Sequence, residues 1–139
     1  MERCRRFEVP GTPVGKGRPK FSRAGAGVRT YTPEKTANYE TLVKWAYASE
    51  YAGAPLLEGA VRMVIMACYP VPKSWPKKKQ EAALRGDIRP MTKPDADNIA
   101  KAISDALNGL AYRDDAQVVD LLVQKYYSDE PRVVVEVDG

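Results

Sequence analysis

The spacing of apolar residues predicts helices in the first and last thirds of the chain. Thr32 and Pro33 suit the N-cap and first turn of one helix. Its apolar stripe recurs at intervals of three and four residues: Tyr39, Leu42, Val43 and Ala46. A second helix is predicted from Asp95 to Leu107, stopped by Asn108-Gly109, with this stripe: Ile99, Ile103, Ala106 and Leu107. A short basic helix is expected from Lys77 to Leu84, ended by Gly86.

Strands are predicted near both ends of the chain and in its middle. Phe7 to Val9, closed by Pro10, is typical of a short strand. Val61 to Tyr69 is apolar at nearly every position, which predicts a central strand buried on both faces. Gln117 to Tyr127 and Arg132 to Val137 suit two strands around the turn at 128–131, the last with one buried face. Residues 11–29, rich in Gly, Pro and Ser, are expected to form a flexible basic loop. The fold class is therefore α+β, one domain of residues 1–139 with a mixed or antiparallel sheet.

Charge is distributed unevenly along these 139 residues, whose net charge is +4. Residues 1–93 carry 18 basic and 8 acidic side chains, and residues 94–139 carry 4 basic and 10 acidic ones. A basic portion points to a polyanion partner, whereas an acidic portion points to a cation or to a solvated face. An enzyme that holds nucleic acid and a divalent metal accounts for both portions.

The composition also excludes several kinds of chemistry. The chain has no histidine, which rules out a Ser-His-Asp or Cys-His catalytic group and a His-ligated zinc. Cys4 and Cys68 form no C-x-x-C pair, so neither a zinc site nor a disulfide scaffold is implied. No apolar run is long enough for a signal core or a membrane span, and we expect a cytoplasmic protein.

Carboxylates gather around the second predicted helix. Asp95 and Asp97 stand at its start, where free N–H groups favour anions, and Lys101 follows Asp97 by one turn. Asp114 and Asp115 follow the end of that helix, just before a strand. If the strand packs beside the helix, a pocket of three carboxylates and one lysine forms. Carboxylates crowded together repel unless a hard cation lies among them, and oxygen-only sites suit Mg²⁺ or Mn²⁺.

Each of these residues also has a structural interpretation. An Asp-x-Asp pair at a helix start can serve only as a cap. Asp97 and Lys101 can form a surface ion pair of small value, and Asp114-Asp115 can be turn residues. Nucleotide-sugar transferases also carry Asp-x-Asp, but 139 residues leave little room for their usual domains.

Two basic clusters are candidates for DNA contact. Lys16, Arg18 and Lys20 alternate in the Gly/Pro-rich loop, where the backbone can approach phosphates closely. The second cluster surrounds Trp75, with these members: Lys73, Lys77, Lys78 and Lys79. The alternatives are a solvated loop and a charged helix face with Trp75 packed on the core. Four aromatic residues are expected in the core or a dimer interface: Trp45, Tyr47, Tyr126 and Tyr127. Arg5 and Arg6 are expected to belong to a frayed terminus.

The whole string Lys93-Pro-Asp-x-Asp-Asn-x-x-Lys-x-x-x-Asp-Ala-Leu-Asn-Gly-x-x-Tyr-x-Asp-Asp-Ala-Gln-Val118 resembles the RusA-type Holliday junction resolvases of bacteria and their phages. The segments Val14–Lys20 and Tyr31-Thr-Pro-Glu also resemble phage and prophage members. The likeness runs from about Phe7 to Val137. One departure is Lys20, where similar proteins often have arginine.

The resemblance implies a homodimeric, Mg²⁺-dependent endodeoxyribonuclease that nicks two strands of a four-way junction symmetrically during recombination and repair. Carried over, the metal-binding aspartates fall on Asp95, Asp97 and Asp115, and the essential lysine falls on Lys101. Asp114 and Asn98 match motif positions whose roles stay open. Two other functions remain alternatives: a broader structure-selective nuclease acting on flaps or forks, and a DNA-binding module without catalysis.

Overall fold

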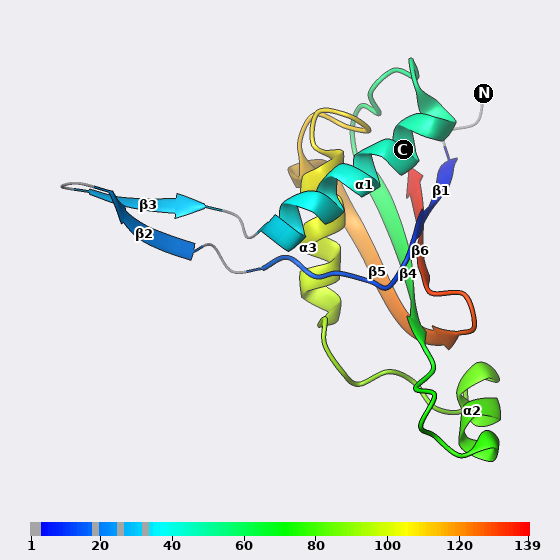
Figure 1. The fold of residues 1–139 in the computed structure, drawn as a ribbon. Coiled ribbons are helices and arrows are strands. Elements are labelled where there is room, and N and C mark those ends of the chain that lie inside the picture. The colour runs from blue at the N-terminus through cyan, green and yellow to red at the C-terminus, as the bar shows by residue number, and fades with distance from the viewer. Residues whose placement is uncertain (1–3, 18–19, 25–26, 32–33) are drawn as a thin grey trace.

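A four-stranded sheet with two helices packed against one face forms the body of the protein (Figure 1). The computed structural model describes residues 4–17, 20–24, 27–31 and 34–139, and the side chains of 4–17 and 34–139. The elements in chain order are β1 (Cys4–Pro10), β2 (Lys20–Ala24), β3 (Gly27–Tyr31), α1 (Glu34–Tyr51), β4 (Val61–Pro70), α2 (Lys77–Leu84), α3 (Ala96–Leu107), β5 (Val118–Ser128) and β6 (Arg132–Asp138). A 3₁₀ turn, Asp115–Gln117, precedes β5.

The sheet has the strand order β1-β6-β4-β5. β6 runs antiparallel to both of its neighbours, whereas β4 and β5 are parallel. Parallel strands need a crossover, and the connection between β4 and β5 contains α2 and α3. The prediction of an α+β domain with a mixed sheet is confirmed, as are the bounds of the short basic helix at 77–84.

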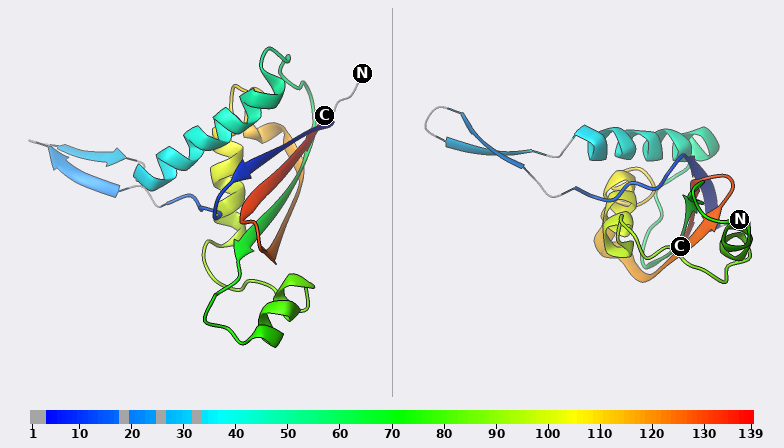
Figure 2. Two further views of the ribbon diagram at one scale, coloured as in Figure 1. Left: turned by 45° about the vertical axis from the view of Figure 1, so that its right-hand side comes forward. Right: turned by 60° about the horizontal axis from the view of Figure 1, so that its bottom comes forward.

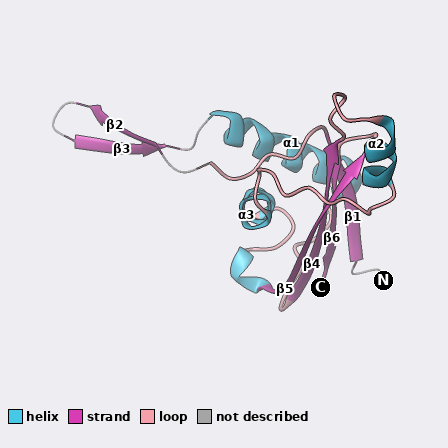
Figure 3. Cartoon of the chain, turned by 90° about the horizontal axis from the view of Figure 1, so that it is seen from below, coloured by secondary structure: helices cyan, strands magenta, loops and turns pink. Residues whose placement is uncertain are grey.

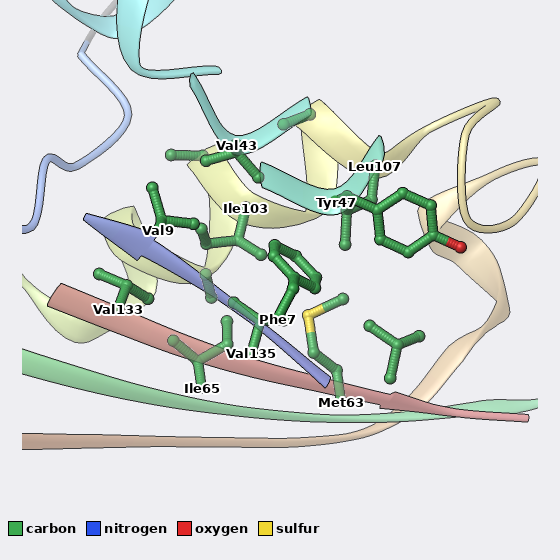
Figure 4. Packing of buried hydrophobic residues seen from close by; sticks show 14 of the residues in the cluster. Phe7, Val9, Val43, Tyr47, Met63, Ile65, Ile103, Leu107, Val133 and Val135 are labelled. Carbon is green, nitrogen blue, oxygen red and sulfur yellow. The ribbon is translucent and has the colours of Figure 1, made fainter. Parts of the chain in front are cut away.

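The hydrophobic core lies between the sheet and the helices α1 and α3 (Figures 3 and 4). The predicted stripe of α3 is fully buried: Ile99, Ile103, Ala106 and Leu107. On α1 the predicted stripe is buried except at Leu42, which is partly exposed. The strands supply the floor with these residues: Phe7, Val9, Met63, Ile65, Val133 and Val135.

The loop predicted over residues 11–29 is wrong in part, because β2 and β3 pair as an antiparallel hairpin. In every view of Figures 1 and 2 this hairpin extends away from the body. Hairpin pairing depends on backbone hydrogen bonds, and the sequences of β2 and β3 have few apolar residues in the alternating pattern that predicts a strand. Thr32, Pro33 and Arg18 lie outside the described residues.

Two further expectations need correction. β4 is central, but only one of its faces is fully buried, and Arg62 on the other face is exposed. Neither Arg5 nor Arg6 is part of a frayed end, because both lie in β1 and pair with β6. Arg5 is 8% exposed, and its Nη1 donates to the hydroxyl of Tyr47 at 2.7 Å. Trp45 is exposed on α1 and so lies outside the core, while its other expected place, a dimer interface, stays a prediction. No helix within the described ranges is long and apolar enough to cross a membrane.

Two buried tyrosines of α1 provide a matched pair for a stability measurement. Tyr47→Phe removes the acceptor of the buried Arg5 guanidinium and should lower the free energy of unfolding by about 1–3 kcal/mol. Tyr39 is also buried, but its hydroxyl has no hydrogen-bond partner among the described residues. Tyr39→Phe should therefore change stability by less than about 0.5 kcal/mol or increase it. Urea unfolding of both variants checks this, and equal losses would contradict it.

Candidate active site

The start of α3 presents two carboxylates to solvent. Asp95 is the N-cap residue of α3, yet its side chain makes no capping hydrogen bond. Asp97, in the first turn, is exposed as well. Capping therefore does not account for the Asp95 carboxylate, and both groups are available beside the free N–H groups of the first turn.

The backbone just before α3 is held by the end of β4. The hydroxyl of Tyr69 donates to the carbonyl oxygen of Pro94. Burial, followed by the nearby charge of Asp95, raises the pKa of Tyr69 to about 12, so this hydroxyl keeps its proton at neutral pH and remains a donor. A residue from the core strand thus fixes the position at which the acidic motif begins.

One turn further along α3, Lys101 lies between two carboxylates. Its Nζ is 3.1 Å from Oδ1 of Asp105 and 3.8 Å from Oδ2 of Asp115. The ion pair suggested between Asp97 and Lys101 is not found in the described part of the chain; Lys101 pairs in the opposite direction along the helix. The structure thus brings together Lys101 and Asp115 as predicted, and adds Asp105.

Asp115 is positioned by the turn that follows α3. Its backbone N–H donates to the side-chain oxygen of Asn108 at 2.8 Å. The neighbouring Asp114 acts as a cap: its carboxylate accepts from the N–H of Ala116, and the side chain of Gln117 completes a capping box. Burial raises the pKa of the Asp115 carboxyl, and Asp114 raises it further, while Lys101 opposes this shift.

The donor atoms at this surface suit a hard cation, but they do not form a closed cluster. Asp95, Asp97 and Asp115 offer oxygen ligands only, which Mg²⁺ and Mn²⁺ prefer. Within residues 4–17, 20–24, 27–31 and 34–139, no group of three acidic or cysteine side chains is close enough to hold a metal ion. The predicted three-carboxylate pocket is therefore not preformed, although the chemistry of its members fits such an ion.

The segment Pro13–Gly17, which we call the strap, crosses between α1 and the start of α3. The N–H of Lys16 donates to the carbonyl of Asn98 at 2.9 Å, and the N–H of Gly17 donates to Thr36 Oγ1 at 2.9 Å. Gly15 has no room for a side chain, since a Cβ there would lie 2.8 Å from the Cβ of Pro94. Between the strap and α3 lies a cavity of about 390 Å³, lined in part by Lys35, Lys93 and Asp95.

Lys16, predicted to contact DNA, has internal partners. Its Nζ lies 2.7 Å from Glu40 Oε1 and 3.3 Å from Asp105 Oδ2, and its side chain is only 21% exposed. The sequence analysis does not point to Glu40, and it includes Asp105 in the motif without giving it a role at the site. Asp105 stands one turn after Lys101, and this spacing indicates an ion pair between the two side chains. Glu40 carried no such signal, because 24 residues separate it from Lys16. Lys20 lies in β2, but its side chain is not described.

The second basic cluster is exposed around α2. Lys73, Lys77 and Lys78 are exposed. The ammonium of Lys79 lies 4.0 Å from the centre of the Trp75 ring, which in turn packs edge-on against Tyr127. Trp75 therefore anchors this cluster to the sheet, while the lysines remain directed to solvent. Figure 1 shows α2 at the end of the body remote from the hairpin.

Comparison with known proteins agrees with this arrangement. The sequence model of the family described as "Endodeoxyribonuclease RusA" matches residues 10–138. A relative from Bacillus subtilis (strain 168), called "Uncharacterized protein YqaN", is 45% identical over 134 residues, which are 95% of this chain and 94% of the relative. The match spans the strap, α3 and the turn before β5. The chain therefore belongs to the RusA endodeoxyribonuclease family.

Proposed function

We propose that this family member is a Mg²⁺-dependent endonuclease that resolves four-way DNA junctions by paired, symmetric nicks, in the recombination and repair of DNA. Mn²⁺ would serve as an alternative ion. A DNA substrate implies action in the cytoplasm of a bacterial or phage-infected cell. Two symmetric nicks need two active sites, so the acting form would be a two-fold homodimer.

The observation that carries this proposal is the outer face of α3. Asp97 and Lys101 follow one another along it, Asp95 begins it, and Lys101 reaches Asp115 from the next segment. Three carboxylates and one ammonium thus lie on or beside this face of α3. Neither capping nor an ion pair with Lys101 occupies Asp95 or Asp97 in the described part of the chain.

The residues would divide the chemistry as follows. Asp95, Asp97 and Asp115 would hold the ion, which when bound supplies Lewis-acid polarisation of a phosphodiester and a more acidic water. Lys101 would oppose the negative charge that grows on the phosphate oxygens. The exposed lysines near α2 would contact phosphates outside the reacting position. Because the chain has no histidine, no imidazole competes for the role of base.

The sharpest test of the metal site compares Asp97→Asn with the unaltered protein on a synthetic four-way junction. Asp97→Asn should bind the junction but lose cutting by about 100-fold or more, because the amide is a weaker ligand for a hard cation. EDTA should abolish cutting by the unaltered protein. Denaturing gels that resolve both nicked strands give the rate and the symmetry.

The matched control is Glu50→Gln, which neutralises an exposed acid at the end of α1 and should cut normally. Strong cutting in EDTA would refute the metal mechanism. Flaps, forks and linear duplex at the same concentration test the junction preference, and faster cutting of duplex would refute it. Unchanged junction binding without any cutting, by the unaltered protein with Mg²⁺ or Mn²⁺, would favour the non-catalytic binding module.

The basic cluster near α2 predicts a change in salt dependence. Lys77→Ala/Lys78→Ala should weaken junction binding and reduce the slope of log affinity against log salt by about 0.9 for each phosphate that is no longer neutralised. Lys44→Ala, which removes an exposed lysine on α1, serves as the control. Fluorescence anisotropy from low to high salt measures both slopes. An unchanged slope in the double variant would mean that α2 does not contact phosphates.

A further inference from the structure

We propose that Asp105 is a positioning residue of the nuclease site: it holds the ammonium of Lys101 along α3, so that Asp115 stays available to a cation. Lys16, reaching from the strap, holds Asp105 in turn. The inference rests on the proposed function, in which Asp115 is a metal ligand and Lys101 faces the phosphate. In this role neither Asp105 nor Lys16 touches the ion or the DNA.

The geometry that carries the inference is the double use of the Asp105 carboxylate. Its Oδ1 lies 3.1 Å from Lys101 and its Oδ2 lies 3.3 Å from Lys16. Its side chain is 20% exposed, so each of its oxygens faces a positive partner in a partly dry environment. Glu40 completes the row at 2.7 Å from Lys16. Acidic and basic groups thus alternate from α1 through the strap and α3 to Asp115.

The ammonium of Lys101 lies within reach of two carboxylates, those of Asp105 and Asp115. Its contact with Asp105 is within hydrogen-bonding distance, whereas its 3.8 Å separation from Asp115 is not. Its side chain is 58% exposed and has a flexible four-carbon stem. Without Asp105, the nearest remaining carboxylate is Asp115, and the ammonium would bind the oxygens that a cation needs. Asp105 prevents this capture because it already engages the ammonium.

Lys16 is necessary because two partly buried carboxylates face the same point. Glu40 and Asp105 are 18% and 20% exposed, and without a shared cation they would repel each other. Burial is the largest single influence on the pKa of the Lys16 ammonium and lowers it. Hydrogen bonds to Glu40 and Asp105, together with their charges, outweigh burial and raise this pKa above its usual value. Lys16 therefore stays charged. The hydrogen bond from its backbone to Asn98 fixes it in place.

The test uses full-length protein and measures Mn²⁺ binding by calorimetry beside junction cutting. Asp105→Asn should weaken Mn²⁺ binding and slow single-turnover cutting by about tenfold or more, with junction affinity within about twofold. The decisive variant is Asp105→Asn/Lys101→Met. Once the ammonium that would capture Asp115 is gone, Mn²⁺ affinity should return to that of the unaltered protein, although cutting should not. Failure to regain Mn²⁺ affinity would overturn the proposal.

Two further variants separate positioning from general stability and from DNA contact. Glu40→Gln disturbs Lys16 but leaves the ion pair between Asp105 and Lys101, so Mn²⁺ affinity should be kept. A loss equal to that of Asp105→Asn would overturn the proposal. Lys16→Met should slow cutting without changing the salt slope of junction binding, and Lys16→Arg should restore the rate. A slope reduced by about 0.9 would instead make Lys16 a phosphate-binding residue.

The calorimetric arm keeps the two proposals distinguishable. If the unaltered protein binds Mn²⁺ but cuts no branched DNA, the proposed function fails, and the Mn²⁺ affinities of Asp105→Asn and Asp105→Asn/Lys101→Met still decide the role of Asp105. If the unaltered protein cuts the junction yet Asp105→Asn keeps full Mn²⁺ affinity and rate, the positioning role is refuted and the nuclease function stands.

Discussion

Burial of one face of α3 is the constraint on which the site depends. Ile99, Ile103 and Leu107 are fully buried between α1 and the sheet, and this fixes the rotation of the helix about its axis. Residues one turn apart on the opposite side must then line up along one face of the helix, away from the core. Asp97, Lys101 and Asp105 are such residues. The order of charges along this face of α3 is thus a consequence of hydrophobic packing, and the strap and the turn after α3 then place Lys16 and Asp115 beside it.

The aspartates along α3 fall into two groups that differ in exposure and in ion pairing. Near the start of α3, Asp95 and Asp97 are exposed and take part in no ion pair within the described residues. Toward its end, Asp105 is partly buried and paired on both sides. Carboxylates of the first kind can exchange water for a cation at little structural cost, whereas loss of a partner from the second kind would leave a charge uncompensated in a partly dry place. Aspartates on one helix face can therefore have different roles, and their exposure to solvent determines which role each one has.

Much of the fold could be predicted from the sequence, because local periodicity reports local burial. The pattern of α3 was strong enough to give its extent and its buried residues, and Gly86 and Gly109 marked where two helices stop. The hairpin β2–β3 was missed because backbone pairing dominates it. The bond between Arg5 and Tyr47 was missed for another reason: the partners are 42 residues apart, and only the packing of α1 on β1 joins them. At the candidate site, the motif indicates Lys101 and Asp115, which lie 3.8 Å apart. No motif indicates Glu40, since the route of the strap determines its contact with Lys16.

The charge imbalance of the sequence overstates the charge that is available to bind DNA or a metal ion, because some of the charged side chains pair with one another. A sum over residues 1–93 counts Lys16 as equal to Lys77, yet the first is held between two carboxylates and the second is exposed. Only charges without internal partners can release counterions when DNA binds, so the effective basic surface is smaller than the sum implies. The same correction applies to the acidic portion, where Asp105 is neutralised by lysines from both portions of the chain. The basic and acidic portions are therefore not separate surfaces for DNA and metal; the strap joins them at α3, and their balance at that point determines which carboxylates remain free to bind an ion.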